Sequence, residues 1–205
     1  AGSLSETWRK GRDWTVDAAR EAGDWTSEKY RQGRAWTGDR VSDLSNALGM
    51  PWSGGLRNGV QLPDSGAGFR FVRYGQWATG RMVAGFEYIG QKLSAAGAPA
   101  MEVGDMSYKN GGPIRRHRSH QNGRDVDIFF IGGSGDGFNV PANWTLLRSA
   151  LDNPHMQVTN VFISNGREAQ LLRHGRKIGD PMAARASSVM SFEPGHHDHF
   201  HIRIQ

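Results

Sequence analysis

The spacing of apolar residues along the chain predicts its regular elements. Residues 77–93 form a predicted helix whose apolar positions recur every three or four residues, at Met82, Phe86, Ile89 and Leu93. Two further helices are predicted at 141–151, with a proline in the first turn, and at 167–174, ended by Gly175. Short runs bounded by turn residues predict strands at 69–74, 101–107, 124–131, 157–164, 187–192 and 199–204.

The order of these elements predicts the fold class. Strands and helices follow each other without strict alternation, which favours an α+β fold with a small mixed or antiparallel sheet flanked by helices. We expect three parts, namely a helical extension at 1–48, a linker rich in Gly, Ser and Pro at 49–67, and a folded domain at 68–205.

The extension contains a repeat in which a basic residue precedes a Trp-Thr pair. Trp14, Trp25 and Trp36 are 11 residues apart, close to three helical turns, so they line one face of a helix or of several short capped helices. Internal glycines weaken a single long helix by about 1 kcal/mol each relative to alanine. We expect this face to dock on the folded domain or on a partner such as a wall polymer or a membrane surface.

Charge and composition narrow the function. The chain carries a net charge of +5, and the whole excess lies in residues 46–205, because residues 1–45 balance eight basic against eight acidic side chains. The positive charge of residues 46–205 favours anionic partners, although it could also serve solubility alone. The sequence contains no nucleic-acid-binding motif. No stretch has the length of a membrane span, and the first residues do not resemble a signal peptide. The absence of cysteine excludes a thiol nucleophile, a disulfide and a cysteine-bound metal.

Histidines carry the candidate chemistry. Two of the eight, His155 and His174, stand alone, and we interpret them as ordinary surface or core residues. The other six fall into two clusters, made of His117 and His120, and of His196, His197, His199 and His201.

The first cluster leads into a strand that carries two carboxylates. Asp125 and Asp127 are two residues apart and share one face, while Val126 and Ile128 face the core. This pattern predicts a loop that brings histidines up to a strand bearing aspartates.

The second cluster lies on the last predicted strand, where His199 and His201 share a face. Catalytic zinc takes three ligands from His, Asp or Glu and leaves a position for water, whose pKa falls to roughly 7. The two clusters together supply such a set, although an ion-paired or pH-sensitive surface without metal would show the same pattern.

These residues resemble a known family. The runs 103–107, 111–112 and 116–128, the ending 195–203 and the upstream run 58–63 resemble the penicillin-insensitive murein endopeptidases, over residues 56–205. The resemblance implies the small zinc-peptidase fold shared with lysostaphin-type peptidases, D-Ala-D-Ala peptidases and the hedgehog domain. It also implies cleavage of peptidoglycan cross-links, of the D-Ala to meso-diaminopimelate type, in the periplasm or after secretion.

Site roles follow from the resemblance residue by residue. It places the Zn²⁺ ligands on His120, Asp127 and His201, and it makes His199 the group that orients or deprotonates the attacking water. Further positions near the metal fall on His117 and His196, and Asp125 lies beside them.

Two departures from the family pattern keep alternatives open. The Trp repeat is foreign to the family, and Glu193-Pro-Gly-His196 is similar to the motif of D-Ala-D-Ala dipeptidases and carboxypeptidases, with Glu193 as base and His196 as third ligand. We favour His201 as that ligand and keep Glu193 as a candidate catalytic or supporting residue. The competing functions are a D,D-carboxypeptidase or dipeptidase and a non-catalytic, zinc-containing wall-binding module.

Overall fold

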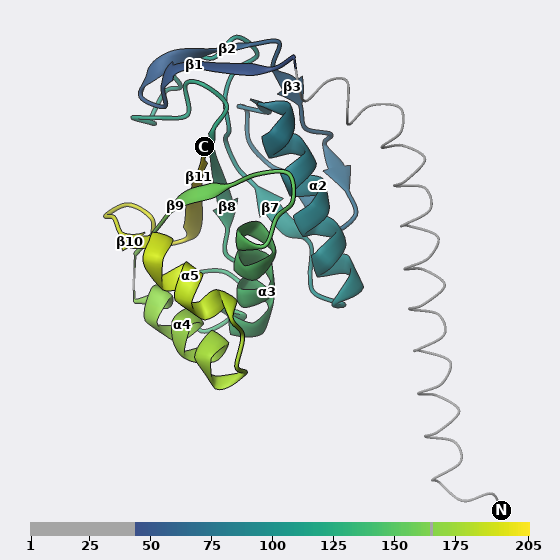
Figure 1. Cartoon of the computed structure of the whole chain (residues 1–205), viewed down its shortest axis with the longest axis vertical. Coiled ribbons are helices and arrows are strands. Elements are labelled where there is room, and N and C mark those ends of the chain that lie inside the picture. Colours follow the sequence, from purple (N-terminus) through teal and green to yellow (C-terminus); the bar gives the residue numbers. More distant parts are fainter. Residues whose placement is uncertain (1–43, 165) are drawn as a thin grey trace, which may run out of the picture. The chain divides into compact units, whose positions relative to one another are not determined.

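The computed structural model describes residues 44–164 and 166–205. The described residues belong to one compact unit built on a seven-stranded sheet (Figure 1). In spatial order the strands are β10 (Met190–Phe192), β9 (Val158–Ile163), β11 (His199–Ile204), β8 (Asp125–Phe129), β7 (Met101–Val103), β5 (Phe69–Phe71) and β4 (Ser65–Gly66). Two of the pairings, β10 with β9 and β5 with β7, are parallel, and the others are antiparallel.

Two small sheets complete the strands of the described part. An antiparallel hairpin joins β1 (Asn46–Met50) to β2 (Ser53–Arg57), and a second antiparallel pair joins β3 (Val60–Gln61) to β6 (Trp77–Ala78). The hairpin bonds to the segment that carries the first histidine cluster, since Gln121 N–H donates to the carbonyl of Pro51 and Leu56 N–H donates to that of Asn110.

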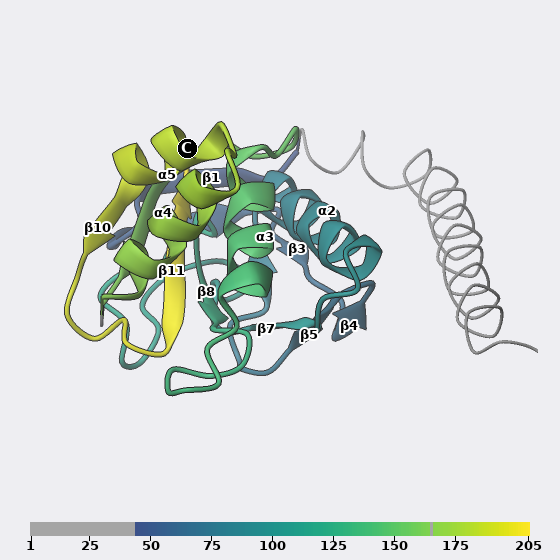
Figure 2. The same cartoon turned by 90° about the horizontal axis from the view of Figure 1, so that it is seen from below.

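Helices cover one side of the main sheet (Figures 1 and 2). In the described ranges they are α2 (Gly80–Ala95), α3 (Val140–Leu151), α4 (Arg167–Lys177) and α5 (Met182–Val189). Side chains cap two of them, because Thr79 accepts from Met82 N–H at the start of α2 and Asn139 accepts from Ala142 N–H at the start of α3.

The core lies between these helices and the sheet, and it confirms the alternation predicted for the two central strands. Val126 and Ile128 of β8 are fully buried in it, as are Phe200 and Ile202 of β11. The aspartates of β8 and the histidines of β11 therefore face the opposite side of the sheet. The α+β class is confirmed as well.

Several predicted elements differ from the structure. The stretch 49–67, expected as a linker, is folded into parts of four strands and buries Leu62 in the core. The strand predicted at 187–192 is half helix, because α5 runs to Val189 before β10 begins. Gly175 lies within α4 and does not end it; a Cβ at this position would lie 2.3 Å from the Trp144 ring, so the glycine lets α4 approach α3.

The predicted Trp repeat at 9–37 lies outside the described residues, as does most of the expected extension 1–48. Among the described residues, no helix has the length and apolar character needed to cross a membrane.

Candidate metal centre

The register of β8 and β11 brings the two predicted clusters together. His201 is the direct cross-strand partner of Asp127, and Arg203 is that of Asp125. Cross-strand partners on one face have Cβ atoms about 5 Å apart, so these four side chains meet above the sheet.

The loop that precedes β8 brings His120 to the same place. Its backbone has a φ of 65°, in the left-handed region, and its N–H donates to Asp125 Oδ2 at 3.2 Å. Its Nδ1 lies 3.1 Å from the carbonyl oxygen of Met106, which can only accept, so Nδ1 carries a proton and Nε2 is left with a lone pair in the neutral ring.

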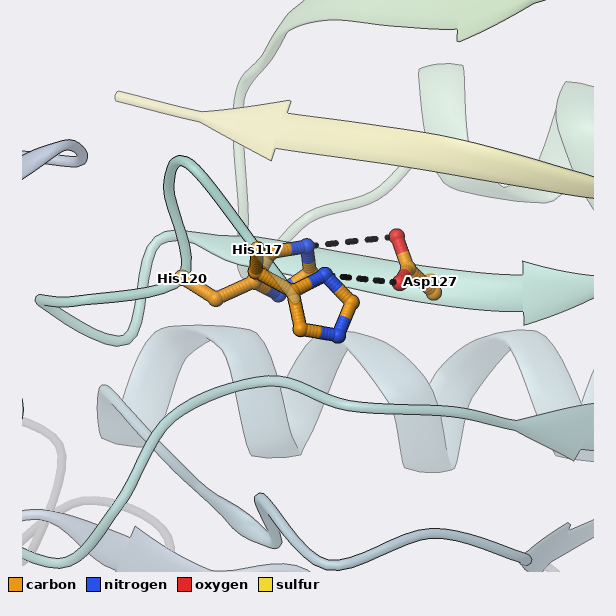
Figure 3. A group of neighbouring side chains, drawn as sticks. All are labelled: His117, His120 and Asp127. Carbon is orange, nitrogen blue, oxygen red and sulfur yellow. Dashed lines mark ion pairs between the residues drawn. The ribbon is translucent and has the colours of Figure 1, made fainter. Parts of the chain in front are cut away.

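Four imidazoles converge on the carboxylate of Asp127. Its Oδ1 lies 3.2 Å from His120 Nε2, 3.4 Å from His201 Nδ1 and 3.6 Å from His199 Nε2. Its Oδ2 lies 3.7 Å from His117 Nδ1 (Figure 3).

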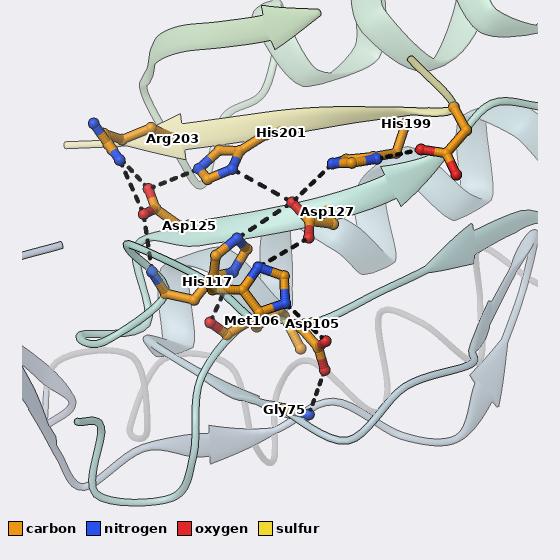
Figure 4. Close-up of polar contacts among 11 residues, drawn as sticks. Gly75, Asp105, Met106, His117, Asp125, Asp127, His199, His201 and Arg203 are labelled. Carbon is orange, nitrogen blue, oxygen red and sulfur yellow. Dashed lines mark hydrogen bonds and ion pairs between the residues drawn. The ribbon is translucent and has the colours of Figure 1, made fainter. Parts of the chain in front are cut away.

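Each of these rings is held from behind by an oxygen acceptor (Figure 4). The outer nitrogen is the ring nitrogen that points away from Asp127. In His120 it lies near Met106 O, and in His201 it lies 3.5 Å from Asp125 Oδ1. In His199 it lies 2.7 Å from Asp198 Oδ1, and in His117 it lies 3.1 Å from Asp105 Oδ2. Histidines that bind metals have this arrangement, in which the second nitrogen donates to a carboxylate or carbonyl.

The donor set fits a divalent cation. His120 Nε2 and Asp127 Oδ1 are buried polar atoms that make no hydrogen bond in the structure, and they lie 3.2 Å apart. Buried polar atoms without a partner are rare and costly, and an ion that accepts their lone pairs removes that cost. Both atoms belong to residues predicted as ligands, and the third predicted ligand, His201, turns its Nδ1 toward the same Asp127 oxygen at 3.4 Å.

A grouping by mutual distance gives a related set. His117, His120 and Asp127 each offer a ligand atom, and these atoms all lie within 4.8 Å of one another. His120 and Asp127 are common to this set and to the predicted one, so His117 and His201 are the alternatives for a third candidate ligand.

The charges of the centre are strongly coupled. Burial raises the pKa of Asp127, but His120, His201 and His199 outweigh it and lower that pKa to about 2. Burial lowers the pKa of His120, yet the charge of Asp127 outweighs it and leaves that pKa above its usual value. Burial also lowers the pKa of His201, and here the net shift stays downward.

Asp125 is fully buried beneath the centre. Arg203 donates to it twice, from Nε to Oδ1 at 2.7 Å and from Nη2 to Oδ2 at 3.1 Å. Burial raises the pKa of Asp125, but contacts with His201 and Arg203 outweigh it and hold that pKa far below the usual range. The guanidinium itself lies between two aromatic rings, 5.6 Å from the centroid of Trp52 and 5.3 Å from that of Phe162.

Asp105 holds His117 in a similar way. Its Oδ1 accepts the N–H groups of Tyr74 and Gly75, and its Oδ2 faces His117 Nε2. Burial raises the pKa of Asp105, while the bond from His117 and the two backbone bonds outweigh it and lower that pKa well below its usual range.

The remaining predicted residues lie around this centre. The ring of His196 is 5.1 Å from that of His199 and 5.3 Å from that of His201. Glu193 lines a pocket together with these three histidines, and its backbone carbonyl, rather than its carboxylate, contacts His196 Nδ1.

Two pockets meet at the centre. One has a volume of about 840 Å³ and the other of about 490 Å³, and both are lined by Arg116, His117, Asp127 and His199. The first extends toward Trp52 and Phe162, and the second toward Arg73 and Tyr74. A bound chain could therefore continue on both sides of the histidines.

The sequence did not identify all of the residues that support the centre. Asp198 lies next to His199 in the His-His-Asp-His run, and a carboxylate at this position could have been recognised as a hydrogen-bond partner of that histidine. Asp105 lies in one of the runs that carry the family resemblance, but its contact with His117 depends on how the loop folds. Arg203 shares the alternation of β11 with the histidines, and that pattern could have placed it on their face, whereas its position opposite Asp125 depends on the register of β11 with β8.

Comparison with known proteins gives the same family as the motifs. Residues 47–140 match the model of the family described as penicillin-insensitive murein endopeptidase, a range that contains the first histidine cluster, Asp125 and Asp127. A curated relative, the penicillin-insensitive murein endopeptidase of Haemophilus influenzae, is 26% identical over 189 residues. That match covers 78% of this chain and 63% of the relative, so the chain spans less than two thirds of the relative's length. By the family match and this relative, the chain is similar to the penicillin-insensitive murein endopeptidases.

Proposed function

We propose that this chain is a zinc-dependent peptidase that hydrolyses peptide cross-links in bacterial peptidoglycan, of the D-Ala to meso-diaminopimelate type. The observation that carries the proposal is the convergence of four imidazoles on Asp127, in a family named for murein endopeptidases. Such a substrate lies in the cell wall, so we propose a periplasmic or secreted location.

We propose His120, Asp127 and His201 as the protein ligands of the zinc ion. His120 Nε2 and Asp127 Oδ1 are buried atoms that lack a hydrogen bond, and His201 directs Nδ1 toward Asp127 at 3.4 Å. Each histidine has its outer nitrogen beside an oxygen atom, Met106 O for His120 and Asp125 Oδ1 for His201. Zinc held by these residues would supply Lewis acidity, which acidifies water and polarises an amide carbonyl.

His199 is the proposed general base. Its Nδ1 faces Asp198 at 2.7 Å, which fixes the proton on Nδ1 and leaves the Nε2 lone pair directed toward the pocket. Nε2 takes a proton from the attacking water and returns it to the departing amine, while Asp198 stabilises the imidazolium formed between the two steps. His196 lies on the other side of His199, where it can donate a hydrogen bond to the oxygen that gains negative charge.

The shape of the site favours an endopeptidase over the two alternatives. A carboxypeptidase or dipeptidase needs a pocket that ends close to the reacting bond, whereas here pockets extend from both sides of His117 and His199. A wall-binding module with structural zinc has no need of His199 and its Asp198 partner, because structural zinc sites are closed by four protein ligands.

The test is metal content measured together with digestion of purified cross-linked muropeptide dimers. We expect one zinc per wild-type chain, dimers cut to monomers, and loss of both in His120→Ala. The variant His174→Gln, on α4, is the matched control and should retain both properties. Release of terminal D-Ala without dimer cleavage would instead support the carboxypeptidase.

The same measurement decides the third ligand. If His201 is the ligand, His201→Ala loses zinc while His117→Ala keeps it and loses only part of the activity. The reverse result would assign the third position to His117, as the distance grouping suggests.

A further inference from the structure

Arginines lie on both sides of the candidate metal centre. Arg118 lines the larger pocket, Arg73 and Arg115 line the smaller one, and Arg116 lines both. All four are exposed. Three of them fall within the four-residue run 115–118, so a single loop carries most of this charge to the site.

These four arginines differ from the arginines that form ion pairs elsewhere in the described chain. Arg70, Arg148 and Arg203 each form an ion pair with a carboxylate of the protein. Within the described residues, no such pair is found for Arg73, Arg115, Arg116 or Arg118. Their charge is therefore available to a bound molecule.

Most carboxylates in the same pockets are already engaged. Asp105 accepts two backbone N–H groups and faces His117, Asp198 faces His199, and Asp127 is the centre itself. Among the described residues that line the two pockets, only Glu193 has a carboxylate that contacts neither a histidine nor a backbone N–H. Glu193 is exposed and belongs to the larger pocket. Both pockets therefore present more positive than negative charge to a substrate.

The backbone also holds the basic loop in an unusual conformation. Arg116 has a φ of 78°, in the left-handed region that is uncommon for a residue with a side chain. Arg116 lines both pockets, at the place where they meet. Such conformations persist where the surrounding structure enforces them, and they concentrate at binding sites.

We propose that these arginines bind carboxylate groups of the substrate on both sides of the bond that is cut. Arg118 binds a carboxylate in the larger pocket, and Arg73 and Arg115 bind one in the smaller pocket. The substrate class is accordingly an anionic peptide with free carboxylates flanking the scissile amide, an assignment that rests on the proposed hydrolytic function. Guanidinium groups suit this task, because their N–H donors match both oxygens of a carboxylate.

The test combines charge removal in the protein with charge removal in the substrate. Muropeptide dimers with free carboxylates and with the same carboxylates amidated are digested by wild type, Arg118→Gln and Arg73→Gln, and KM and kcat are measured separately. The matched control is Arg173→Gln, an exposed arginine on α4 outside both pockets.

In wild type we expect amidation to raise KM about twofold to fivefold for each carboxylate, with little change in kcat, as for one exposed ion pair. In each arginine variant KM is already raised, and amidation of the carboxylate on that side has no further effect. The control variant should respond to amidation as wild type does. If the arginine variants keep the full response to amidation on both sides, the proposal is wrong.

Binding without cleavage separates this proposal from the proposed function. A synthetic stem tetrapeptide with free carboxylates, and its amidated form, are titrated into wild type and the same variants by calorimetry. If wild type cuts no dimer but binds the free-acid peptide more tightly, and the arginine variants lose that preference, the hydrolytic function fails and the arginine proposal stands. If dimers are cut but no protein distinguishes the two peptides, the arginine proposal fails alone.

Discussion

Replacing Arg203 by methionine tests how the floor of the candidate centre is held together. The side chain of Arg203 is only 19% exposed and that of Asp125 is fully buried, so their two hydrogen bonds lie largely out of water. Methionine keeps most of the length that packs between Trp52 and Phe162, but it removes the charge. Asp125 would then be a buried carboxylate that has lost its arginine partner.

The expected cost follows from that burial. Removing one partner of a buried ion pair costs about 3–5 kcal/mol, whereas exposed pairs contribute about 1 kcal/mol or less. Since Arg203 keeps some contact with solvent, we expect Arg203→Met to lower the free energy of unfolding by about 3 kcal/mol. For a domain of this size that corresponds to a fall in Tm of roughly 6–12 °C.

The assay is urea and thermal unfolding at pH 7 in the presence of a chelator, so that metal binding does not contribute. Arg70→Met is the matched control, because Arg70 pairs with Glu102 where both side chains are well exposed, at 63% and 39%. It should cost less than about 1 kcal/mol. Equal effects of the two substitutions would refute the reasoning.

Two further measurements sharpen this prediction. In the double variant Asp125→Asn with Arg203→Met, no charge remains buried without a partner, so part of the lost stability should return. The pH dependence has a defined sign: the folded pKa of Asp125 is lowered, so its contribution is fully present above the unfolded value of about 3.9 and is lost as pH falls below it. The difference between wild type and Arg203→Met should therefore be constant above about pH 5 and shrink as the pH falls below about 4.

Three other predictions follow from the structure. His199→Ala should lower kcat for dimer cleavage by about 10²- to 10⁴-fold while zinc content is unchanged, and Asp198→Asn should cause a smaller loss, both measured by steady-state kinetics. Zinc affinity should weaken as pH falls through the raised pKa of His120, because the ion must displace that proton; calorimetry in buffers of different ionisation enthalpy counts the protons released. Gly175→Ala should destabilise the chain by about 1–3 kcal/mol in urea unfolding, because its Cβ meets the Trp144 ring.

The parts of the fold and site that could be predicted are those set by local periodicity. The alternation of Asp125 to Ile128 and of His199 to Ile202 fixed which side chains face the core, and the structure has them so. Helix α3 was predicted within one residue of its start because its pattern, its proline and its length agree.

What could not be predicted depends on contacts between distant segments. The glycine-rich stretch 49–67 has no strong pattern of its own, and it folds because it pairs with β5 and β6 and bonds to the loop at 110–121. The helix α5 was missed because its short, weakly apolar run packs on α3 and α4, which the local pattern does not reveal. The contact of Asp105 with His117 likewise arises only when the loop between them closes.

The charges of the centre favour a metal site over a purely ion-paired cluster. In a cluster without metal, each inner nitrogen would need a proton to face Asp127 favourably. His120 can carry one, because Asp127 raises its pKa, but burial holds the pKa of His201 below the usual value, so that ring stays neutral near pH 7. A neutral ring has one N–H for two nitrogens, and those of His201 face the carboxylates of Asp127 at 3.4 Å and Asp125 at 3.5 Å. One lone pair of His201 must therefore oppose a carboxylate oxygen, which is unfavourable unless a cation lies between them. The proposed zinc ion removes this repulsion, and the ion-paired alternative does not.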